Sequence, residues 1–296
     1  MKELENCKIC PVSCGVNRNH HQIGRCGAGE NIKMALASLH KFEEPCISGK
    51  NGSGAVFFSN CNLKCVYCQN YEISHLGHGR EIEVEELAEI FLSLQDKKAH
   101  NINLVTPTMY VPQIKEAILI AKEKGLLLPI IYNSSGYETV ETIKSLKGYI
   151  DVYLPDFKYS SNILGLKYSH VQNYFEVATK AIQEMYYQVG DPIFDSDGMI
   201  QSGMIIRHLI LPNHVVNSKG VLKWIQENLS TQVYISLMAQ YFPTYQAKDI
   251  EKLNRKITKK ELSEVQRYMY HLGFENGYIQ ELGEHEEEYV PDFLKK

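Results

Sequence analysis

Three cysteines stand within eight residues of this chain, at Cys61, Cys65 and Cys68. They follow the apolar run 55–58 directly, so one tight loop can direct three thiolates at one centre. Iron–sulfur clusters are held by cysteine thiolates, and a cubane 4Fe–4S cluster has four irons to ligate. Three local cysteines leave one iron without a protein ligand. Such an open position is typical of a site that does chemistry.

Zinc and disulfides are the two other interpretations of these cysteines. Zinc sites favour paired C-x2-C units and a fourth ligand. Disulfides need an oxidising compartment, and residues 1–7 contain no hydrophobic region for export. The spacing therefore favours an iron–sulfur cluster. It also leads us to expect a cytoplasmic protein that needs anaerobic conditions if the cluster is exposed.

The composition limits the classes of protein that are possible. All 8 cysteines lie at or before position 68, as expected of metal ligands and not of a disulfide scaffold spread over a fold. The net charge of −4 gives no reason to expect nucleic-acid binding. No apolar run approaches the ~20 residues that span a bilayer, so we expect no membrane partner.

Apolar strands and amphipathic helices alternate after a cysteine-rich, loop-like segment at residues 1–50. The expected strands are 55–59, 102–105, 128–133, 150–154, 204–211 and 232–238, and the expected helices are 84–98, 111–124, 138–147, 170–188, 217–229 and 258–272. Thr258 and Glu261 form a capping box for the last helix. Alternation without hairpin signals predicts a parallel sheet, and six units predict an α/β partial (β/α)6 barrel over residues 51–296 with a carboxyl-terminal extension.

Polar residues recur where the apolar strands stop. They are Thr106, Asn133, Ser134, Asp156, Lys158 and Arg207. Ligands of parallel α/β folds lie at the carboxyl ends of the strands, so these residues are candidates for binding one. The alternative is ordinary turn chemistry, which favours Asn, Ser and Asp at the same places.

The spacing C-x3-C-x2-C, with Tyr67 before the last cysteine, resembles the radical S-adenosylmethionine (SAM) superfamily. The resemblance implies a six-unit partial barrel and a 4Fe–4S cluster whose open iron is chelated by the amino and carboxylate groups of SAM. Lys158 or Ser134 could then supply a partner for the SAM carboxylate. Tyr67, Thr106 and Arg207 join them as candidate cofactor-binding residues.

Two segments resemble the pyruvate formate-lyase activating enzymes. Residues 133–137 are similar to that family's Asp-Thr-Asn-Gly-Phe, and residues 156–158 to its Asp-Leu-Lys. The resemblance implies contacts of Asn133, Ser134, Asp156 and Lys158 with SAM or with a nearby monovalent cation. Asn133 stands where the family has Asp, which removes one negative charge from that cation site. The family's Gly-Gly-Glu stretch is replaced by Thr-Pro-Thr at 106–108.

Nearly the whole chain resembles the PflX-type branch of radical SAM proteins. The motifs that carry this resemblance are 43–49, 58–74, 100–108, 153–159 and 289–293. The branch is named for its likeness to the activating enzymes, and the name does not establish that its members activate a lyase.

Four further cysteines, Cys7, Cys10, Cys14 and Cys26, form a second set. Four thiolates close a coordination shell, so we expect a structural or electron-relay site that holds either zinc or a second 4Fe–4S cluster. Cys46 is left over. We interpret it as a small buried residue, and the alternative is a substrate-handling thiol at the barrel mouth.

The function expected from these features is that of a radical SAM enzyme. Reductive cleavage of SAM would give a 5′-deoxyadenosyl radical that abstracts hydrogen from a substrate. By resemblance the donor is a glycine of a glycyl-radical enzyme, and a small molecule, another peptide or an RNA is compatible as well. The catalytic residues stay unknown, and the electron donor would be of the flavodoxin or ferredoxin type. The alternative is a non-catalytic iron–sulfur or zinc protein, such as a redox sensor or an assembly factor.

Overall fold

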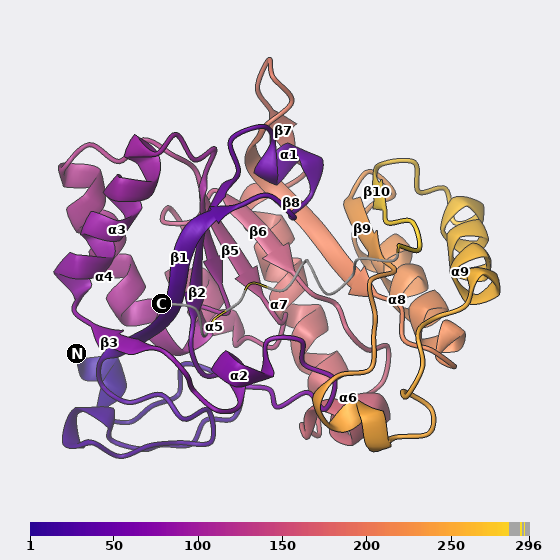
Figure 1. The fold of residues 1–296 in the computed structure, drawn as a ribbon, viewed down its shortest axis with the longest axis horizontal. Helices are drawn as coiled ribbons and strands as arrows, with labels where there is room; N and C mark the ends of the chain where they lie inside the picture. Colours follow the sequence, from indigo (N-terminus) through magenta and orange to yellow (C-terminus); the bar gives the residue numbers. More distant parts are fainter. Residues whose placement is uncertain (284–290, 292, 294–296) are drawn as a thin grey trace.

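The computed structural model describes residues 1–283, 291 and 293 and contains one mixed β-sheet of ten strands (Figure 1). The strands are β1 (Ile32–His40), β2 (Ser53–Phe58), β3 (Arg80–Ile82), β4 (Ile102–Val105), β5 (Ile130–Ser134), β6 (Val152–Pro155), β7 (Ile193–Phe194), β8 (Ile200–Leu209), β9 (Tyr234–Met238) and β10 (Gly277–Ile279). The helices are α1 (Pro45–Ser48), α2 (Tyr71–Ser74), α3 (Val84–Asp96), α4 (Val111–Glu123), α5 (Val140–Ser145), α6 (Asn162–Ser169), α7 (Tyr174–Val189), α8 (Val215–Asn228) and α9 (Lys259–His271).

The sheet is open, with the order β10-β9-β8-β6-β5-β4-β2-β1-β3, and β7 pairs with β8 outside this path. The strands from β2 to β10 in this order run parallel to one another. Parallel strands need crossover connections, which helices supply between most of them. This arrangement confirms the predicted α/β partial barrel.

A row of side chains crosses the central strands and joins them to the helices. Val56 pairs with Leu104, Leu104 with Tyr132, Tyr132 with Tyr153 and Tyr153 with Met204. All five residues are fully buried in the largest apolar cluster of the described chain. Their neighbours along the strands lie in two smaller clusters. Burial on both faces explains why these strands are nearly continuous apolar runs in the sequence.

Two parts of the sheet differ from the sequence prediction. Residues 1–50 are not all loop, because β1 pairs antiparallel with β2 and with β3. A hairpin also exists, since β7 pairs antiparallel with β8. The sheet is therefore mixed, and its antiparallel strands lie outside the parallel centre. Helix α6 was not predicted either, because exposed Ile163 and Leu166 interrupt any single apolar face.

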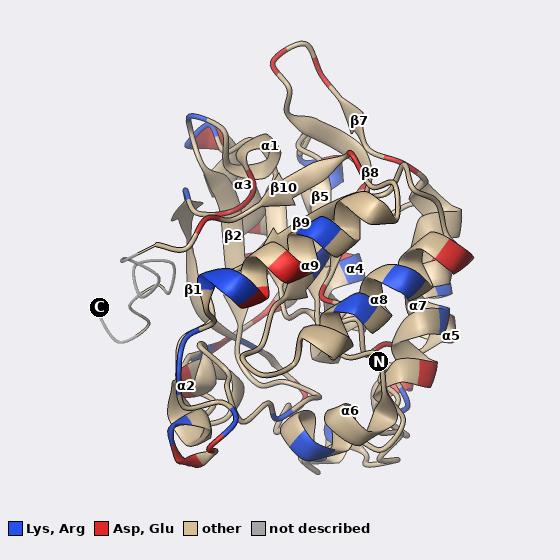
Figure 2. Ribbon diagram, turned by 90° about the vertical axis from the view of Figure 1, so that its right-hand side faces the viewer, with Lys and Arg blue, Asp and Glu red and all other residues tan. Residues whose placement is uncertain are grey.

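No helix among the described residues is long and apolar enough to cross a bilayer. In the view of Figure 2, basic and acidic residues both lie on the outer helices. The acidic run 284–288 and most of the motif 289–293 lie outside the described residues, but Phe293 packs edge-to-face on Phe57 with ring centroids 5.4 Å apart.

The predicted capping box at α9 is confirmed. The Thr258 hydroxyl accepts from the Glu261 N–H at 3.2 Å, and the Glu261 carboxylate accepts from the Thr258 N–H at 2.8 Å. The same carboxylate accepts from Arg255 and from the Asn213 N–H, so it ties two loops to the helix. Hydrogen bonding from Arg255 is the main cause that lowers the Glu261 pKa to about 2, against the ordinary 4.5.

Glu261→Gln tests this connection. A carboxyl group with a lowered folded-state pKa stabilises the fold above its unfolded pKa and loses that effect as the pH falls through the folded value. We expect the variant to lose about 1 kcal/mol of unfolding free energy at pH 7 and progressively less as the pH falls from 4.5 toward 2, measured by urea denaturation. Lys259→Gln, an exposed change in the same turn, is the control. A loss that stays equal over this pH range would contradict the assignment.

Candidate active site

The cysteine loop leaves β2 through Asn60, which adopts a left-handed conformation (φ 74°). The Asn60 N–H donates to the Ile73 carbonyl at 2.8 Å, and its side chain donates to the Tyr110 hydroxyl at 2.9 Å. Asn is one of the few residues other than Gly that visits this conformation readily. The turn directs Cys61 away from the strand and starts the loop.

Hydrogen bonds from three directions fix the rest of the loop. The Val66 N–H donates to the Tyr168 carbonyl, the Lys64 ammonium to the Ser74 carbonyl, and the Asn62 amide to the Tyr137 carbonyl, at 2.9, 2.8 and 2.7 Å. Leu63 between them is fully buried. The positions of the three thiols are therefore set by α2, by α6 and by the turn after β5.

Two serines contact the cysteine sulfurs, and sequence analysis missed both. Ser169 Oγ lies 3.0 Å from Cys65 Sγ, and Ser74 Oγ lies 3.1 Å from Cys68 Sγ. Burial raises the pKa of the Cys65 thiol to about 11 and raises that of Cys68 as well. Once a metal has displaced the thiol protons, each hydroxyl can donate to a thiolate.

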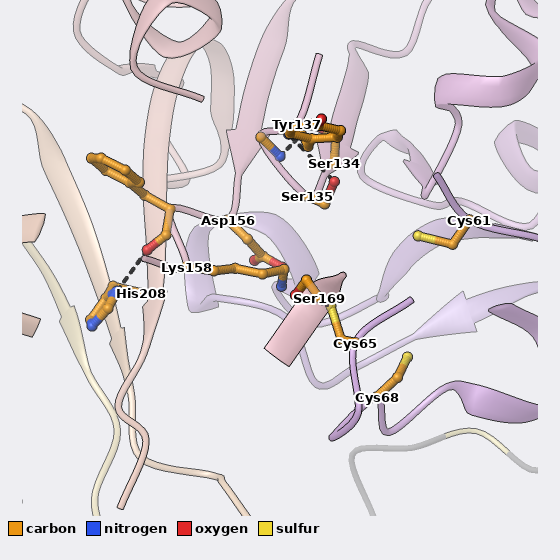
Figure 3. A network of polar contacts seen from close by, with 12 residues as sticks. Cys61, Cys65, Cys68, Ser134, Ser135, Tyr137, Asp156, Lys158, Ser169 and His208 are labelled. Atoms are coloured by element: carbon orange, nitrogen blue, oxygen red, sulfur yellow. Dashed lines mark hydrogen bonds and ion pairs between the residues drawn. The ribbon is translucent and has the colours of Figure 1, made fainter. Parts of the chain in front are cut away.

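The strand ends and the cysteine loop line one cavity. Of the predicted site residues, its walls include Cys61, Cys65, Cys68, Tyr67, Thr106, Asn133, Ser134, Asp156, Lys158 and Arg207. Figure 3 shows the cysteines on one side of the site, with Asp156 and Lys158 beside them. The structure thus brings together every residue that the sequence suggested for the cluster and for its ligand.

Asp156 and Lys158 form an ion pair at the end of β6. Lys158 Nζ lies 2.6 Å from Asp156 Oδ2, and both side chains remain partly exposed to the cavity. Burial lowers the Lys158 pKa, but the Asp156 carboxylate and the Cys65 thiol outweigh it, so the pKa lies above the ordinary value. The Tyr174 hydroxyl fixes the backbone here, since it accepts from the Lys158 N–H and donates to the Asp156 carbonyl. The wall therefore carries one fixed positive charge beside the thiols.

Thr106 occupies the place of the first glycine in the family's Gly-Gly-Glu stretch. Its backbone is left-handed (φ 58°), a conformation that β-branched residues rarely adopt. Its N–H donates to the Asn133 carbonyl at 2.9 Å, which holds the strained residue against the end of β5. Such strain costs on the order of 1–3 kcal/mol and is concentrated at functional sites.

Arg207 reaches the cavity wall but is already engaged by two carboxylates. Its guanidinium donates to Glu44 through Nε at 2.8 Å and also pairs with Glu43. All three side chains are at most 10% exposed. The Nε and Nη2 atoms of Arg207 are therefore committed to Glu43 and Glu44, and its predicted role in cofactor binding stays a prediction. No local sequence pattern indicates this pairing, since the partners lie 163 and 164 residues apart.

The four amino-terminal cysteines lie in the loops before β1, whereas Cys46 lies in α1. Cys7 and Cys10 are buried, Cys26 is partly buried and Cys14 is exposed. Among the described residues, no group of three or more His, Cys, Asp or Glu side chains has the geometry of a site for a single metal ion. Cys46 is buried in a small apolar cluster, as predicted.

The chain that forms the cavity at the cysteine loop is similar in sequence to known proteins. Residues 55–190, which include the cysteine loop and the Asp156–Lys158 pair, match the radical SAM superfamily. Over 272 residues the chain is 32% identical to the uncharacterized protein MJ0674 of Methanocaldococcus jannaschii, covering 88% of this chain and 73% of that protein. The chain belongs to the radical SAM superfamily.

More distant matches cover smaller shares of the chain. The pyruvate formate-lyase-activating enzyme of Clostridium pasteurianum is 27% identical over 136 residues, which are 43% of this chain and 54% of that enzyme. Streptococcus suis SuiB, in a structure bound to precursor peptide SuiA, matches with a TM-score of 0.52 at 13% identity, over 76% of this chain. The hydrogenase maturase HydG of Carboxydothermus hydrogenoformans gives 0.52 at 12%. This chain spans about half of each structure, 47% and 53%, and the likeness shows the fold.

Membership of the radical SAM superfamily implies a 4Fe–4S cluster and SAM, and the residues present fit both. Cys61, Cys65 and Cys68 offer three soft ligands on a fixed loop. In a cubane each thiolate binds a different iron, so three thiols need not converge on one point. The partly exposed Lys158 offers a cation to the carboxylate of SAM.

Arg207→Ala tests the buried ion network of this radical SAM protein. Removal of the guanidinium leaves Glu43 and Glu44 buried without a counter-charge, and we expect a loss of about 3–5 kcal/mol of unfolding free energy. Arg80→Ala breaks an exposed pair with Glu86 and should cost less than about 1 kcal/mol. Urea denaturation of both variants measures the difference, and equal losses would contradict it.

Ser169→Ala tests the hydrogen bond to Cys65. Hydrogen bonds to cluster sulfurs favour the reduced state, so their removal should lower the reduction potential of the cluster. An electron paramagnetic resonance titration of the reconstituted protein measures this shift. Ser160→Ala, which lacks a cysteine contact in the described structure, is the control. An unchanged potential in the Ser169 variant would show that its hydroxyl does not donate to the cluster.

Proposed function

We propose that the chain is a radical SAM enzyme of the activating-enzyme type, and that its substrate is a peptide segment of another protein. The observation that carries the proposal is the shared cavity, where Cys61, Cys65 and Cys68 face Asp156 and Lys158. When bound, the cluster supplies one electron to the sulfonium of SAM, which yields methionine and a 5′-deoxyadenosyl radical able to abstract a hydrogen atom.

Lys158 is the proposed partner of the SAM carboxylate, and Ser134 is the second donor to it. The positive charge of Lys158 is fixed beside the thiols by Asp156, so it is already oriented before SAM binds. Ser134 is buried at the end of β5, where its hydroxyl accepts from the Gly136 N–H at 3.2 Å and also hydrogen-bonds the Glu138 carboxyl group, so it would exchange that partner for the SAM carboxylate. Asn133 and Asp156 are the proposed partners of the remaining polar groups or of a monovalent cation.

Tyr67, Thr106 and Arg207 have more indirect proposed roles. The Tyr67 hydroxyl lies 2.7 Å from that of Tyr159, which fixes the ring in the cavity wall next to Cys68. The left-handed turn at Thr106 shapes the wall where the family has glycine. Arg207 holds Glu43 and Glu44 at the mouth of the cavity, where a second cavity adjoins it. There they would meet the substrate before it reaches the cluster.

A peptide substrate is supported by similarity and by the shape of the mouth. The chain is 27% identical over 136 residues to an enzyme named for activating pyruvate formate-lyase. A second cavity shares Glu43, Arg207 and Gln240 with the first and extends toward β10 at the sheet edge. An extended segment could reach the first cavity along that path, and a glycine Cα–H is the hydrogen donor that we propose.

The test is formation of 5′-deoxyadenosine by reduced protein that has been reconstituted with iron and sulfide without oxygen. We expect the parent chain to cleave SAM and Cys65→Ala to lose cleavage. Lys158→Gln should bind SAM about 10–100-fold more weakly, since a charge-assisted hydrogen bond contributes about 1.5–3 kcal/mol. Lys124→Gln, an exposed surface change, is the control.

A SAM-binding titration separates the possible failures. Binding without cleavage would mean that the assay lacks the substrate that triggers turnover. An intact cluster without SAM binding would contradict the enzyme assignment and favour a non-catalytic iron–sulfur protein. Normal SAM affinity in Lys158→Gln would contradict the role of Lys158 alone.

A further inference from the structure

The amino-terminal cysteines are held in a compact knuckle. The Cys7 N–H donates to the Val16 carbonyl, and the Cys7 carbonyl accepts from the Gly15 N–H, both at 3.0 Å. Cys14 Sγ lies 3.9 Å from the Cys7 carbonyl oxygen. Cys14 Sγ also lies against Gly24, two residues before Cys26. The turn that carries Cys26 therefore packs against the turn that carries Cys7, Cys10 and Cys14.

Gly24 leaves the room that one of these sulfurs occupies. A Cβ atom added at Gly24 would lie 2.6 Å from Cys14 Sγ, closer than real contacts allow. Gly24 has an ordinary backbone conformation, so space for the sulfur explains the absence of a side chain here better than backbone freedom does.

Arg18 lies beside this set and lacks an acidic partner. Its side chain is 1% exposed, Nε donates to the Gly29 carbonyl and Nη1 to the Met109 carbonyl. Nη2 has no hydrogen-bond partner, and no ion pair among residues 1–283 includes Arg18. A buried guanidinium without a counter-charge is costly.

The charge of Arg18 acts on the Cys26 thiol and on the Tyr110 hydroxyl, and its guanidinium lies 5.7 Å from the centre of the Tyr110 ring. Four thiolates around a metal centre carry a net negative charge, whether the centre is zinc or an iron–sulfur cluster. A metal–thiolate centre would therefore supply the counter-charge that Arg18 lacks. The unpaired charge of Arg18 thus indicates a negative centre here, whereas the position of the cysteine set in the fold distinguishes iron from zinc.

Three contacts connect the set to the cluster loop. A Cβ at Gly27, next to Cys26, would lie 2.8 Å from Asn60 Oδ1, next to Cys61. Arg25 donates to the Ser169 carbonyl, and the Ser169 hydroxyl contacts Cys65 Sγ.

The third contact runs through the turn after β5. The Asn62 amide, next to Cys61, donates to the carbonyl of Tyr137, and Thr142, five residues further on, donates to the carbonyl of Ile9, next to Cys10, at 2.6 Å. A zinc site that only stabilises the fold has no need of such proximity, because zinc does not change its oxidation state. Figure 1 agrees, since the amino-terminal loops lie at the same end of the sheet as α2.

We propose that Cys7, Cys10, Cys14 and Cys26 hold a second iron–sulfur cluster that passes electrons to the cluster at Cys61, Cys65 and Cys68. The relay rests on the proposed function, because the electron acceptor is the cluster that cleaves SAM. The identity of the metal at the amino-terminal cysteines is independent of that function. Each turnover moves one electron. A low-potential protein donor of the ferredoxin or flavodoxin class is oxidised by one electron at the exposed Cys14 side, and SAM is reduced by that electron in the cavity.

The first experiment uses the full chain with Cys61, Cys65 and Cys68 all changed to Ala. After anaerobic reconstitution we expect about four irons and four sulfides per chain, with 4Fe–4S absorption, against about eight irons in the parent protein. The metal content of both proteins as purified, before reconstitution, is measured beside it. One tightly held zinc per chain with only about four irons in the parent would overturn the proposal. This readout needs no SAM cleavage, so it is separate from the test of the enzyme assignment.

The second experiment tests the relay with Cys14→Ser, at the exposed end of the set. With a reduced ferredoxin as donor, we expect deoxyadenosine formation to fall at least tenfold. With titanium(III) citrate, which is small enough to enter the open cavity, we expect near-parental rates. A fall with both donors would show a structural role, and no fall with either would also overturn the relay.

Arg18→Gln should change the reduction potential of the amino-terminal cluster, which a purely structural role of Arg18 would leave unchanged. Loss of a buried positive charge disfavours the more negative, reduced cluster, so the potential of the amino-terminal cluster should become more negative. The triple Cys→Ala background isolates this cluster for the titration, and exposed Lys8→Gln is the control. An unchanged potential would contradict the pairing of Arg18 with the cluster.

Discussion

The common direction of the central strands is the constraint on which the site depends. Because β2, β4, β5, β6, β8 and β9 run parallel, their carboxyl ends meet at one edge of the sheet. The cysteine loop follows one of these ends, and the Asp156–Lys158 pair follows another. A reversed strand in this central region would carry its polar end to the opposite edge and out of reach of the cluster.

This arrangement also explains how charge is managed at the mouth. Lys158 is paired with Asp156, and Arg207 with Glu43 and Glu44, so buried or half-buried charges there have partners before any ligand binds. Paired charges keep fixed positions, and a preorganised site avoids the cost of ordering them during binding. Arg18 is the exception among these groups, and it lies next to the amino-terminal cysteines.

Features encoded by neighbouring residues could be predicted from the sequence, whereas long-range pairs could not. The cysteine spacing, the apolar strands and the polar residue after each strand are local, and parallel topology then places them at one edge. The pairing of Arg207 with Glu43 and Glu44 joins residues more than 160 positions apart, and no local pattern indicates it. Ser169 was missed for the same reason, since it reaches Cys65 across 104 positions from an unpredicted helix. Strand β1 was missed because seven of its nine residues are only partly buried, so it lacks the apolar run of the centre.

The early position of all 8 cysteines has a consequence for the synthesis of the chain. Every thiol leaves the ribosome before the serine that contacts Cys65, which comes about a hundred residues after Cys68. At translation rates of roughly 5–20 residues per second, this interval lasts on the order of ten seconds. During that time the nascent chain carries a full complement of metal-binding thiols without the barrel that buries them. The cell must therefore deliver metal late, or shield these thiols from oxidants until the last strands are in place.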